Sequence, residues 1–262
     1  MLLTKKERDD FMIRVIMSVV CIYSLFMKKI LGLITARGGS KRLPRKNIKE
    51  FLGKPLLVWS IDVGKQSNVF DHFILSTDDE EIASIGKAHG VDVPFIRPAE
   101  LATDMATSLD VVIHAVNWMR ENRKYYADWI ILLEPSCPGR QSFHIQEVKQ
   151  IIEERDDIDS LVGISRVPGR MSYLKQLENI GDEIVMPVVK SECTNFKRNQ
   201  DLPITYYVNS AIYAFRVNNL LEGSLWGKRR YGYEMDTVYS QDIDSKDDWI
   251  VAEARMKHLL EQ

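Results

Sequence analysis

A run of basic residues beside two glycines is the part of the sequence with the clearest chemical capacity. Six cations lie between Arg37 and Lys49, and Gly38 and Gly39 stand among them. Glycines let backbone N–H groups approach phosphate oxygens, while lysine and arginine offset negative charge. Neither GxxxxGK[ST] nor GxGxxG is present. The run therefore predicts a local triphosphate site of another kind; the alternative is a solvated basic turn.

A pair of aspartates near the carboxyl terminus has the spacing of a metal site. Asp242 and Asp244 stand two apart, so on an extended segment both carboxylates point the same way while Ile243 faces the core. Mg²⁺ commonly takes one or two carboxylates and completes its octahedron with water and substrate phosphates. The alternative is that Asp244 or Ser245 caps the last helix, with Asp248 in a capping-box position.

These residues must be positioned by an alternating series of elements. The predicted strands cover 30–36, 72–77, 93–96, 129–134 and 161–165. The predicted helices between them cover 56–65, 80–89, 107–122 and 143–154. Parallel strands need helical crossovers, so we expect an α/β fold with a doubly wound, mainly parallel sheet and ligand sites at the carboxyl ends of its strands.

The later part of the chain has a different rhythm. Residues 172–205 are irregular and polar, 206–215 predict a strand, and 246–260 predict a final helix. The stretch at about 171–205 is predicted to be an inserted arm that packs against a second copy of the chain. A long surface excursion without a partner is the alternative.

Composition narrows the class of protein. A chain of 262 residues with 45% hydrophobic and 27% charged residues predicts one main globular domain and excludes disorder or a fibrous repeat. A net charge of −2 excludes a global field for nucleic acid or an anionic membrane. Three cysteines, Cys21, Cys137 and Cys193, lack metal-ligand spacing, which favours reduced thiols in a cytoplasm.

The N-terminus carries an apolar run at residues 11–27. Arg14 interrupts it, and it is shorter than the roughly 20 residues that a bilayer span needs. We expect residues 1–26 to be a dispensable extension, with the functional chain running from Met27 to residue 262. A targeting or anchoring segment is the alternative.

Six blocks in a fixed order carry a family resemblance. They read ARGGSKRLPRKN (36–47), STDDEEIA (76–83), RPAELATDMATS (97–108), LLEPSCPGR (132–140), NSAIY (209–213) and DIDSKDDW (242–249). In these blocks the chain resembles the CMP-acylneuraminate synthetase (cytidylyltransferase) family. The resemblance implies a nucleotide-diphospho-sugar transferase-like domain with a dimerisation arm, working as a homodimer with Mg²⁺ held by Asp242 and Asp244.

The implied reaction joins the CMP part of CTP to a nine-carbon 2-keto sugar acid, N-acetylneuraminate or a relative such as legionaminate or pseudaminate. The anomeric hydroxyl attacks the α-phosphorus and pyrophosphate leaves, so positioning and cations carry the catalysis. By similarity Lys46 and Arg37 would be catalytic. The implied nucleotide contacts are Ala36, Arg37, Ser40, Lys41, Asn47, Arg97 and Ser108.

The sequence leaves other roles open for Arg97, for Ser108 and for the pair Asp78 and Asp79. Arg97 could pair with Glu100 at a turn, and Ser108 could cap the helix that begins near Thr107. Asp78 and Asp79 look like a metal-binding pair, but they suit a helix N-terminus equally well, so we leave them out of the metal site.

The sugar end departs from the neuraminate pattern, which commonly reads LLQPTSPLR. Glu134 replaces an amide that can donate by a carboxylate that only accepts, and Tyr207 stands where an arginine often precedes the NGAIY-like motif. Tyr207 and Asn209 look closer to the legionaminate or pseudaminate activators. The implied sugar contacts are Glu134, Ser136, Cys137, Arg140, Lys175, Arg198 and Tyr207.

Two other functions are open at this point. The same sheet and basic turn could serve a non-catalytic nucleotide-binding module, although Arg37, Lys46, Asp242 and Asp244 are all present. A third hypothesis is a cytidylyltransferase that acts on 3-deoxy-octulosonate. No GxSxG, HExxH or clustered His/Cys set indicates other catalysis.

Overall fold

The computed structural model describes residues 27–181, 184–189 and 198–261. The predicted extension at 1–26, most of the apolar run at 11–27, Cys21, Cys193 and two stretches of the predicted arm lie outside these residues. Within them, no helix is both long and apolar enough to cross a bilayer.

A six-stranded sheet in the order β10-β6-β9-β5-β1-β4 forms the centre of the fold. The strands are β1 (Ile30–Thr35), β4 (His72–Ser76), β5 (Trp129–Leu132), β6 (Ser160–Arg166), β9 (Tyr206–Arg216) and β10 (Arg230–Glu234). β1 pairs in parallel with β4 and β5, and β6 pairs in parallel with β10. Among the described strands of this sheet, only β9 runs antiparallel to its neighbours. The expectation of a mainly parallel α/β sheet is confirmed.

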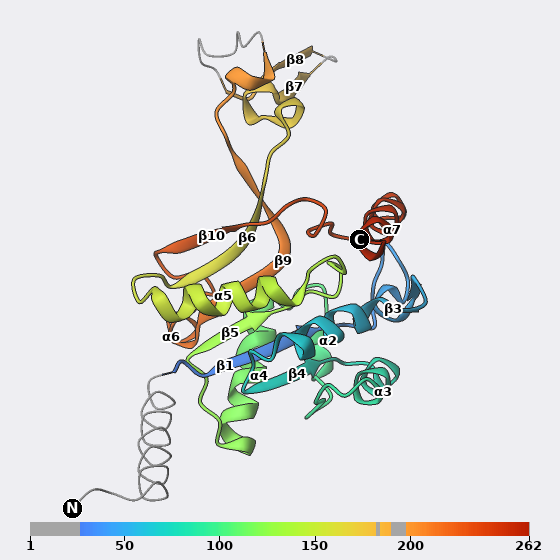
Figure 1. The fold of residues 1–262 in the computed structure, drawn as a ribbon, viewed down its shortest axis with the longest axis vertical. Helices are drawn as coiled ribbons and strands as arrows, with labels where there is room; N and C mark the ends of the chain where they lie inside the picture. The colour runs from blue at the N-terminus through green and yellow to red at the C-terminus, as the bar shows by residue number, and fades with distance from the viewer. Residues whose placement is uncertain (1–26, 182–183, 190–197, 262) are drawn as a thin grey trace, which may run out of the picture.

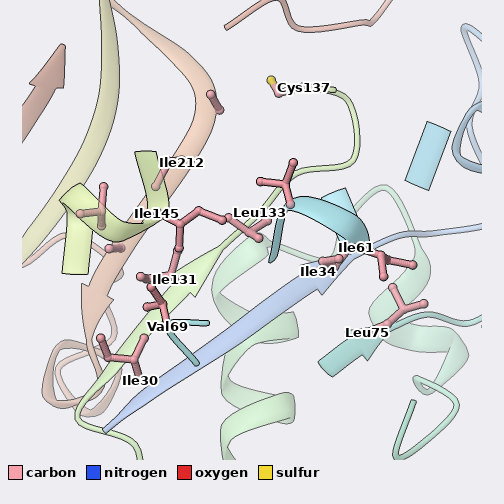
Figure 2. Close-up of a cluster of buried hydrophobic side chains, with 14 of the residues drawn as sticks. Ile30, Ile34, Ile61, Val69, Leu75, Ile131, Leu133, Cys137, Ile145 and Ile212 are labelled. Carbon is pink, nitrogen blue, oxygen red and sulfur yellow. The ribbon is translucent and has the colours of Figure 1, made fainter. Parts of the chain in front are cut away.

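Helices cover both faces of this sheet. They are α2 (Leu56–Ser67), α3 (Glu80–Ala88), α4 (Ser108–Arg123), α5 (Ser142–Glu154) and the short α6 (Val217–Leu221). The last helix, α7 (Lys246–Leu260), packs instead in a separate cluster with Phe51 and Leu56. Alternate residues of β1 point to opposite faces. Ile30 and Ile34 pack with α2 and α5, as Figure 2 shows, while Leu31 and Leu33 pack against α4. A strand buried on both faces must be apolar throughout, which explains its continuous hydrophobic run.

The predicted strand at 93–96 is wrong. Among the described residues, the segment makes one isolated bridge, Thr77 to Ile96, and a second, Ile74 to Asp92, lies just before it. Pro94 lies between them and has no N–H to donate to a ladder. Five strands among the described residues were not predicted: the edge strand β10, the short β2 (Glu50–Phe51) and β3 (Lys54–Pro55), and β7 (Leu177–Gly181) and β8 (Ile184–Pro187) within the predicted arm.

Smaller elements complete the chain. β2 (Glu50–Phe51) and β3 (Lys54–Pro55) form a hairpin in which Leu52 and Gly53 both have positive φ, as a tight hairpin turn requires. Single turns of 3₁₀-helix are η1 (Lys46–Ile48), η2 (Ala99–Ala102), η3 (Gly169–Met171), η4 (Tyr173–Lys175) and η6 (Asn199–Asp201).

The predicted arm projects from the body of the molecule. Figure 1 shows β7 and β8 far from the central sheet, beyond the ends of β6 and β9. The arm exposes Leu177, Ile180, Ile184 and Met186. A two-stranded sheet is marginally stable by itself in water, and nothing among the described residues covers the apolar side chains of this hairpin.

Candidate active site

A cleft of about 580 Å³ opens at the carboxyl ends of β1 and β5. Three loops and the segment before α7 build its walls. Among its lining residues are Thr35, Arg37, Ser40, Lys41, Arg42, Lys46, Asn47, Arg97, Asp104, Ser108, Glu134, Ser136 and Asp244. The cleft lies where an α/β sheet with parallel neighbours is expected to bind ligands. It also gathers most of the residues predicted for the nucleotide.

The glycine turn is shaped by two aspartates of the next strand end. Gly38 N donates to Asp78 Oδ1 at 3.2 Å, and a Cβ at Gly38 would lie 2.6 Å from Asp79 Oδ2, so only glycine fits. Asp79 caps α3 by accepting from Ile82 N and pairs with Arg45, which lowers the pKa of the Asp79 carboxyl. Asp78 and Asp79 therefore support the turn and cap a helix, which agrees with leaving them out of the metal site.

Lys46 is held against the cleft wall by the chain's carboxyl-terminal part. Its Nζ donates to Ile243 O at 2.6 Å and to Asp244 Oδ1 at 3.1 Å. Arg42 Nη2 lies 3.4 Å from the other oxygen of Asp244. Two segments almost 200 residues apart in sequence thus meet through a cation and a carboxylate, and this contact brings the predicted phosphate-site lysine beside a predicted metal ligand.

The cap of α7 leaves Asp244 available. Ser245 is the N-cap, and its side chain and Asp248 form a reciprocal capping box. The predicted alternative of a helix cap is therefore confirmed for Ser245 with Asp248, and it is Ser245 rather than Asp244 that serves as the N-cap. Ile243 is fully buried, as the two-apart spacing predicts.

Asp242 does not line the cleft, but its charge acts on Glu134, which does. Asp242 Oδ1 is buried and has no hydrogen-bond partner in the described part of the chain. Burial and the nearby charge of Asp242 raise the pKa of Glu134 to about 7. No group of three or more acidic, His or Cys side chains suited to a metal occurs among residues 27–181, 184–189 and 198–261. A cation bound here would thus depend on few protein ligands.

Arg97 and Ser108 both reach the cleft. Arg97 is 5% exposed, pairs with Asp78 at 3.4 Å and not with Glu100, and burial lowers the pKa of its guanidinium. Thr107 caps α4 in a capping box with Asp110, so Ser108 is the first helical residue and is not needed as the cap. Both alternatives considered for these residues are excluded.

Two residues predicted to contact the nucleotide, Asn47 and Ala36, lie in different places relative to the cleft. Asn47 lines the cleft and donates to Arg37 O at 3.1 Å, which fixes the basic turn. Ala36 is buried in the core, and its N–H donates to Ser76 O. Ala36 does not line the cleft, so its contribution is to the position of the backbone.

The predicted sugar contacts divide into those at the cleft and those in the core. Glu134 and Ser136 line the cleft, but Arg140 is 1% exposed and donates to Ser60 Oγ at 2.6 Å and to Ala211 O. Cys137 is buried, and burial raises the pKa of its thiol. In this structure Arg140 and Cys137 brace the loop after β5 and do not face the cleft.

The arm residues lie away from the cleft of their own chain. Lys175 Nζ donates to Asn199 Oδ1 at 2.6 Å, and Arg198 pairs with Asp201. Tyr207 is exposed on β9. None of Lys175, Arg198 and Tyr207 lines the cleft, because the arm leads away from the sheet (Figure 1).

A second cavity of about 460 Å³ adjoins the cleft. It shares Thr107, Ser108, Leu132 and Glu134 with the cleft, so Glu134 stands on the common wall. The rest of its lining is mostly apolar and aromatic: Leu109, Tyr213, Phe215, Gly223, Ser224, Leu225 and Trp226. Neither this cavity nor the role of Asp104 in the cleft was predicted from the sequence. Asp104 stood in the RPAELATDMATS block, whereas the segment around Trp226 carried no signal.

Comparisons with known proteins agree with this geometry. The family model described as "Cytidylyltransferase" matches residues 31–234. "Post-translational flagellin modification protein B" of Campylobacter coli is 35% identical over 232 residues, which cover 88% of this chain and 96% of that protein. "CMP-N,N'-diacetyllegionaminic acid synthase" of Campylobacter jejuni subsp. jejuni serotype O:2 is 35% identical, with 87% and 94% covered.

Longer relatives and a solved structure extend the comparison. "N-acylneuraminate cytidylyltransferase" of Streptococcus agalactiae serotype V is 34% identical over 85% of this chain, which spans about half (52%) of that protein's length. The structure of CMP:2-keto-3-deoxy-manno-octonic acid synthetase complexed with CTP has a TM-score of 0.64 at 16% identity and covers 89% of this chain and 100% of that one. The last likeness supports the fold alone.

Proposed function

Because this chain belongs to the cytidylyltransferase family, we propose that it transfers the CMP part of CTP to the anomeric hydroxyl of a nine-carbon 2-keto sugar acid and releases pyrophosphate. The observation that carries the proposal is a single cleft with phosphate-binding cations on one wall and the carboxylate Asp244 on the other, joined to a second cavity at Glu134.

The cleft suits CTP in its charge and its donors. Arg37, Lys41, Lys46 and Arg97 would offset the charge of the triphosphate, and the N-terminal end of α4 at Ser108 would face the base or ribose. Lys46 and Arg37 would stabilise the charge that develops on the phosphate oxygens as the bond to pyrophosphate breaks. No residue of the cleft has to form a covalent intermediate, so placing the two substrates in line is the main task of the protein.

Asp242 and Asp244 fit a divalent cation. Asp242 Oδ1 is a buried oxygen without a partner in the described residues, and carboxylate oxygens are ligands that Mg²⁺ prefers. When bound, Mg²⁺ would supply positive charge to the phosphate oxygens and help to orient them.

The second cavity is our proposed place for the sugar acid. It opens onto the cleft through a shared wall, so a hydroxyl entering from it can reach the phosphates. Its apolar lining suits acyl groups, and Glu134 suits a group with an N–H or O–H donor. The relative named for N,N'-diacetyllegionaminic acid matches almost end to end, so we favour an acylated nonulosonic acid of that kind, with N-acetylneuraminate and pseudaminate as the other candidates.

The working unit is proposed to be a homodimer. The uncovered apolar side chains of β7 and β8 would pack against a second copy, and Lys175, Arg198 and Tyr207 would then lie at or near the partner's cleft. Because CTP is an intracellular nucleotide, the proposed reaction requires a cytoplasmic location.

Pyrophosphate release tests the proposal directly. The full chain is incubated with Mg²⁺, each of the four NTPs and a panel holding N-acetylneuraminate, diacetyllegionaminate, pseudaminate and 3-deoxy-octulosonate. Release only with CTP and a nonulosonic acid is expected. Turnover of 3-deoxy-octulosonate alone, or CTP binding without turnover of any sugar acid, would favour the two alternatives instead.

A further inference from the structure

Asp104 engages two cations of the proposed phosphate site. Arg37 Nη1 donates to Asp104 Oδ1 at 3.0 Å, and Lys41 pairs with Asp104 Oδ2. Arg37 and Lys41 belong to the turn after β1, whereas Asp104 lies between η2 and α4. The two ion pairs therefore tie one wall of the cleft to the other.

On the basis of the proposed function, we propose that Asp104 is an acidic gate residue. Its carboxylate holds Arg37 and Lys41 in the free enzyme, and it must release them when a triphosphate binds. Carboxylate and phosphate oxygens accept from the same guanidinium and ammonium groups. Each N–H that donates to Asp104 is unavailable to a phosphate oxygen, and the carboxylate draws both cations toward itself, so Asp104 competes with the substrate.

The local structure allows this exchange. Side-chain exposure is 41% for Arg37, 78% for Lys41 and 49% for Asp104, and exposed ion pairs are weak enough to be displaced by a ligand of higher charge. The adjoining Met105 is 89% exposed, so the side chain next to Asp104 does not anchor this part of the loop in the core. A carboxylate that stayed in place would also repel the phosphates it faces.

Asp104 differs from the other acids of the cleft. Three carboxylates line it, namely Asp104, Glu134 and Asp244, within the part of the chain that the structure describes. Asp244 is proposed to meet a cation, and Glu134 stands on the wall shared with the second cavity. Asp104 has only the two phosphate-site cations as charged partners in the structure, so its charge is unfavourable once the triphosphate arrives.

The same competition acts on the product. Pyrophosphate leaves from the cations that Asp104 pairs with, so the returning carboxylate would favour its departure. The gate should thus weaken the binding of CTP and of pyrophosphate together, at some cost in affinity for substrate.

The test compares Asp104→Asn with Asp92→Asn. Asp92 forms an exposed pair with Arg123 at 3.5 Å outside the cleft, which makes it a matched control. CTP binding in the presence of Mg²⁺ is measured by calorimetry without sugar acid, and pyrophosphate inhibition is measured during turnover. For Asp104→Asn we expect both the Kd for CTP and the inhibition constant for pyrophosphate to fall about three- to tenfold, since two exposed ion pairs are no longer in competition. Asp92→Asn should leave both constants unchanged.

An unchanged or higher Kd for CTP in Asp104→Asn, with the melting temperature of the wild type, would overturn the gate and make Asp104 a residue that only positions Arg37. A fall in one constant without the other would also count against it. If the wild type bound no CTP at all, the proposed function itself would fail. Binding is measured without sugar acid, so the two failures can be told apart.

Discussion

At the scale of residues, Lys46 has a position that makes a sharp test possible. Its amine is fixed by Ile243 O and Asp244, so it already lies at the cleft before any phosphate arrives. We expect Lys46→Met to lower kcat for pyrophosphate release about 10²- to 10³-fold, since a preorganised cation at developing charge is lost. The methionine keeps the apolar stem of the side chain, so the melting temperature should change little.

Lys54→Met is the matched control for Lys46→Met. Lys54 also pairs with an aspartate, Asp62, but lies outside the cleft. The Lys54→Met enzyme should release pyrophosphate at the wild-type rate. A Lys46→Met enzyme that retained most of its kcat would remove Lys46 from the catalytic set.

The metal assignment gives a second prediction at this scale. Asp242→Asn should raise the Mg²⁺ concentration needed for half of the maximal rate by at least about tenfold, because a carboxylate ligand is replaced by a weaker amide oxygen. A magnesium titration of the initial rate measures this shift. Asp247→Asn, an exposed change in the first turn of α7, should leave the titration where it is in the wild type, and equal curves for all three proteins would argue against Asp242 as a ligand.

The site residues that could be predicted from the sequence are those whose place is set by the course of the backbone. Lys46 lies in the loop after β1, Arg97 follows the bridge of Ile96 with Thr77 beside the end of β4, and Asp244 lies just before α7. Topology brings such positions to one edge of the sheet. The direction of a side chain in an irregular loop is set by tertiary packing, which a sequence does not display. Arg140 and Glu134 belong to one loop, yet Arg140 turns into the core toward Ala211 O while Glu134 lines the cleft.

At the scale of elements, the start of α5 depends on a buried imidazole. His144 stands at the third helical position, and its Nδ1 accepts from Gln141 N. Burial lowers the pKa of His144 from 6.5 to about 4. Between pH 4 and pH 6.5 this imidazole binds a proton in the unfolded chain but not in the folded chain. Its contribution to the free energy of unfolding is therefore fully present above pH 6.5 and is lost as the pH falls toward 4.

His144→Gln should remove that part of the pH dependence. Glutamine at this position can still accept from the N-cap N–H and carries no titrating group. Urea unfolding should show the wild type losing up to about 3 kcal/mol over this window, with a shallower loss in His144→Gln. The exposed His89 provides the control, because His89→Gln should keep the wild-type slope. Parallel pH profiles for wild type and His144→Gln would contradict this account.

Elements with long apolar or amphipathic runs could be predicted, and edge elements could not. β1 and β5 are buried between layers and α4 packs one face against the sheet, so their side chains follow the expected periods. β10 reads RYGYE, with a glycine and two charged ends, and forms because β6 offers it a free edge. The opposite error at 93–96 has the same origin, since a ladder depends on neighbours and Pro94 blocks one there.

At the scale of the whole molecule, the body and the arm are stabilised in different ways. The body has three buried clusters around the sheet and α7. The hairpin of β7 and β8 has exposed apolar side chains and nothing of its own chain over them in the described residues. That contrast supports a second copy as the missing cover, because large apolar side chains gathered on a projecting hairpin are costly to leave in water.

The dimer is tested by placing charge on the hairpin. We expect the wild type to have twice the mass of one chain in sedimentation equilibrium, and the double variant Leu177→Asp/Ile180→Asp to be monomeric, since carboxylates buried in an apolar interface carry a large desolvation penalty. Ile250→Asp is the control, because Ile250 is equally exposed but lies on α7; it should remain a dimer.

If Lys175, Arg198 and Tyr207 serve the partner's cleft, the monomeric variant should keep its affinity for CTP, which its own basic turn binds, while its KM for the sugar acid rises. A monomeric wild type, or a variant that loses CTP binding as strongly as sugar binding, would contradict the shared-site arrangement.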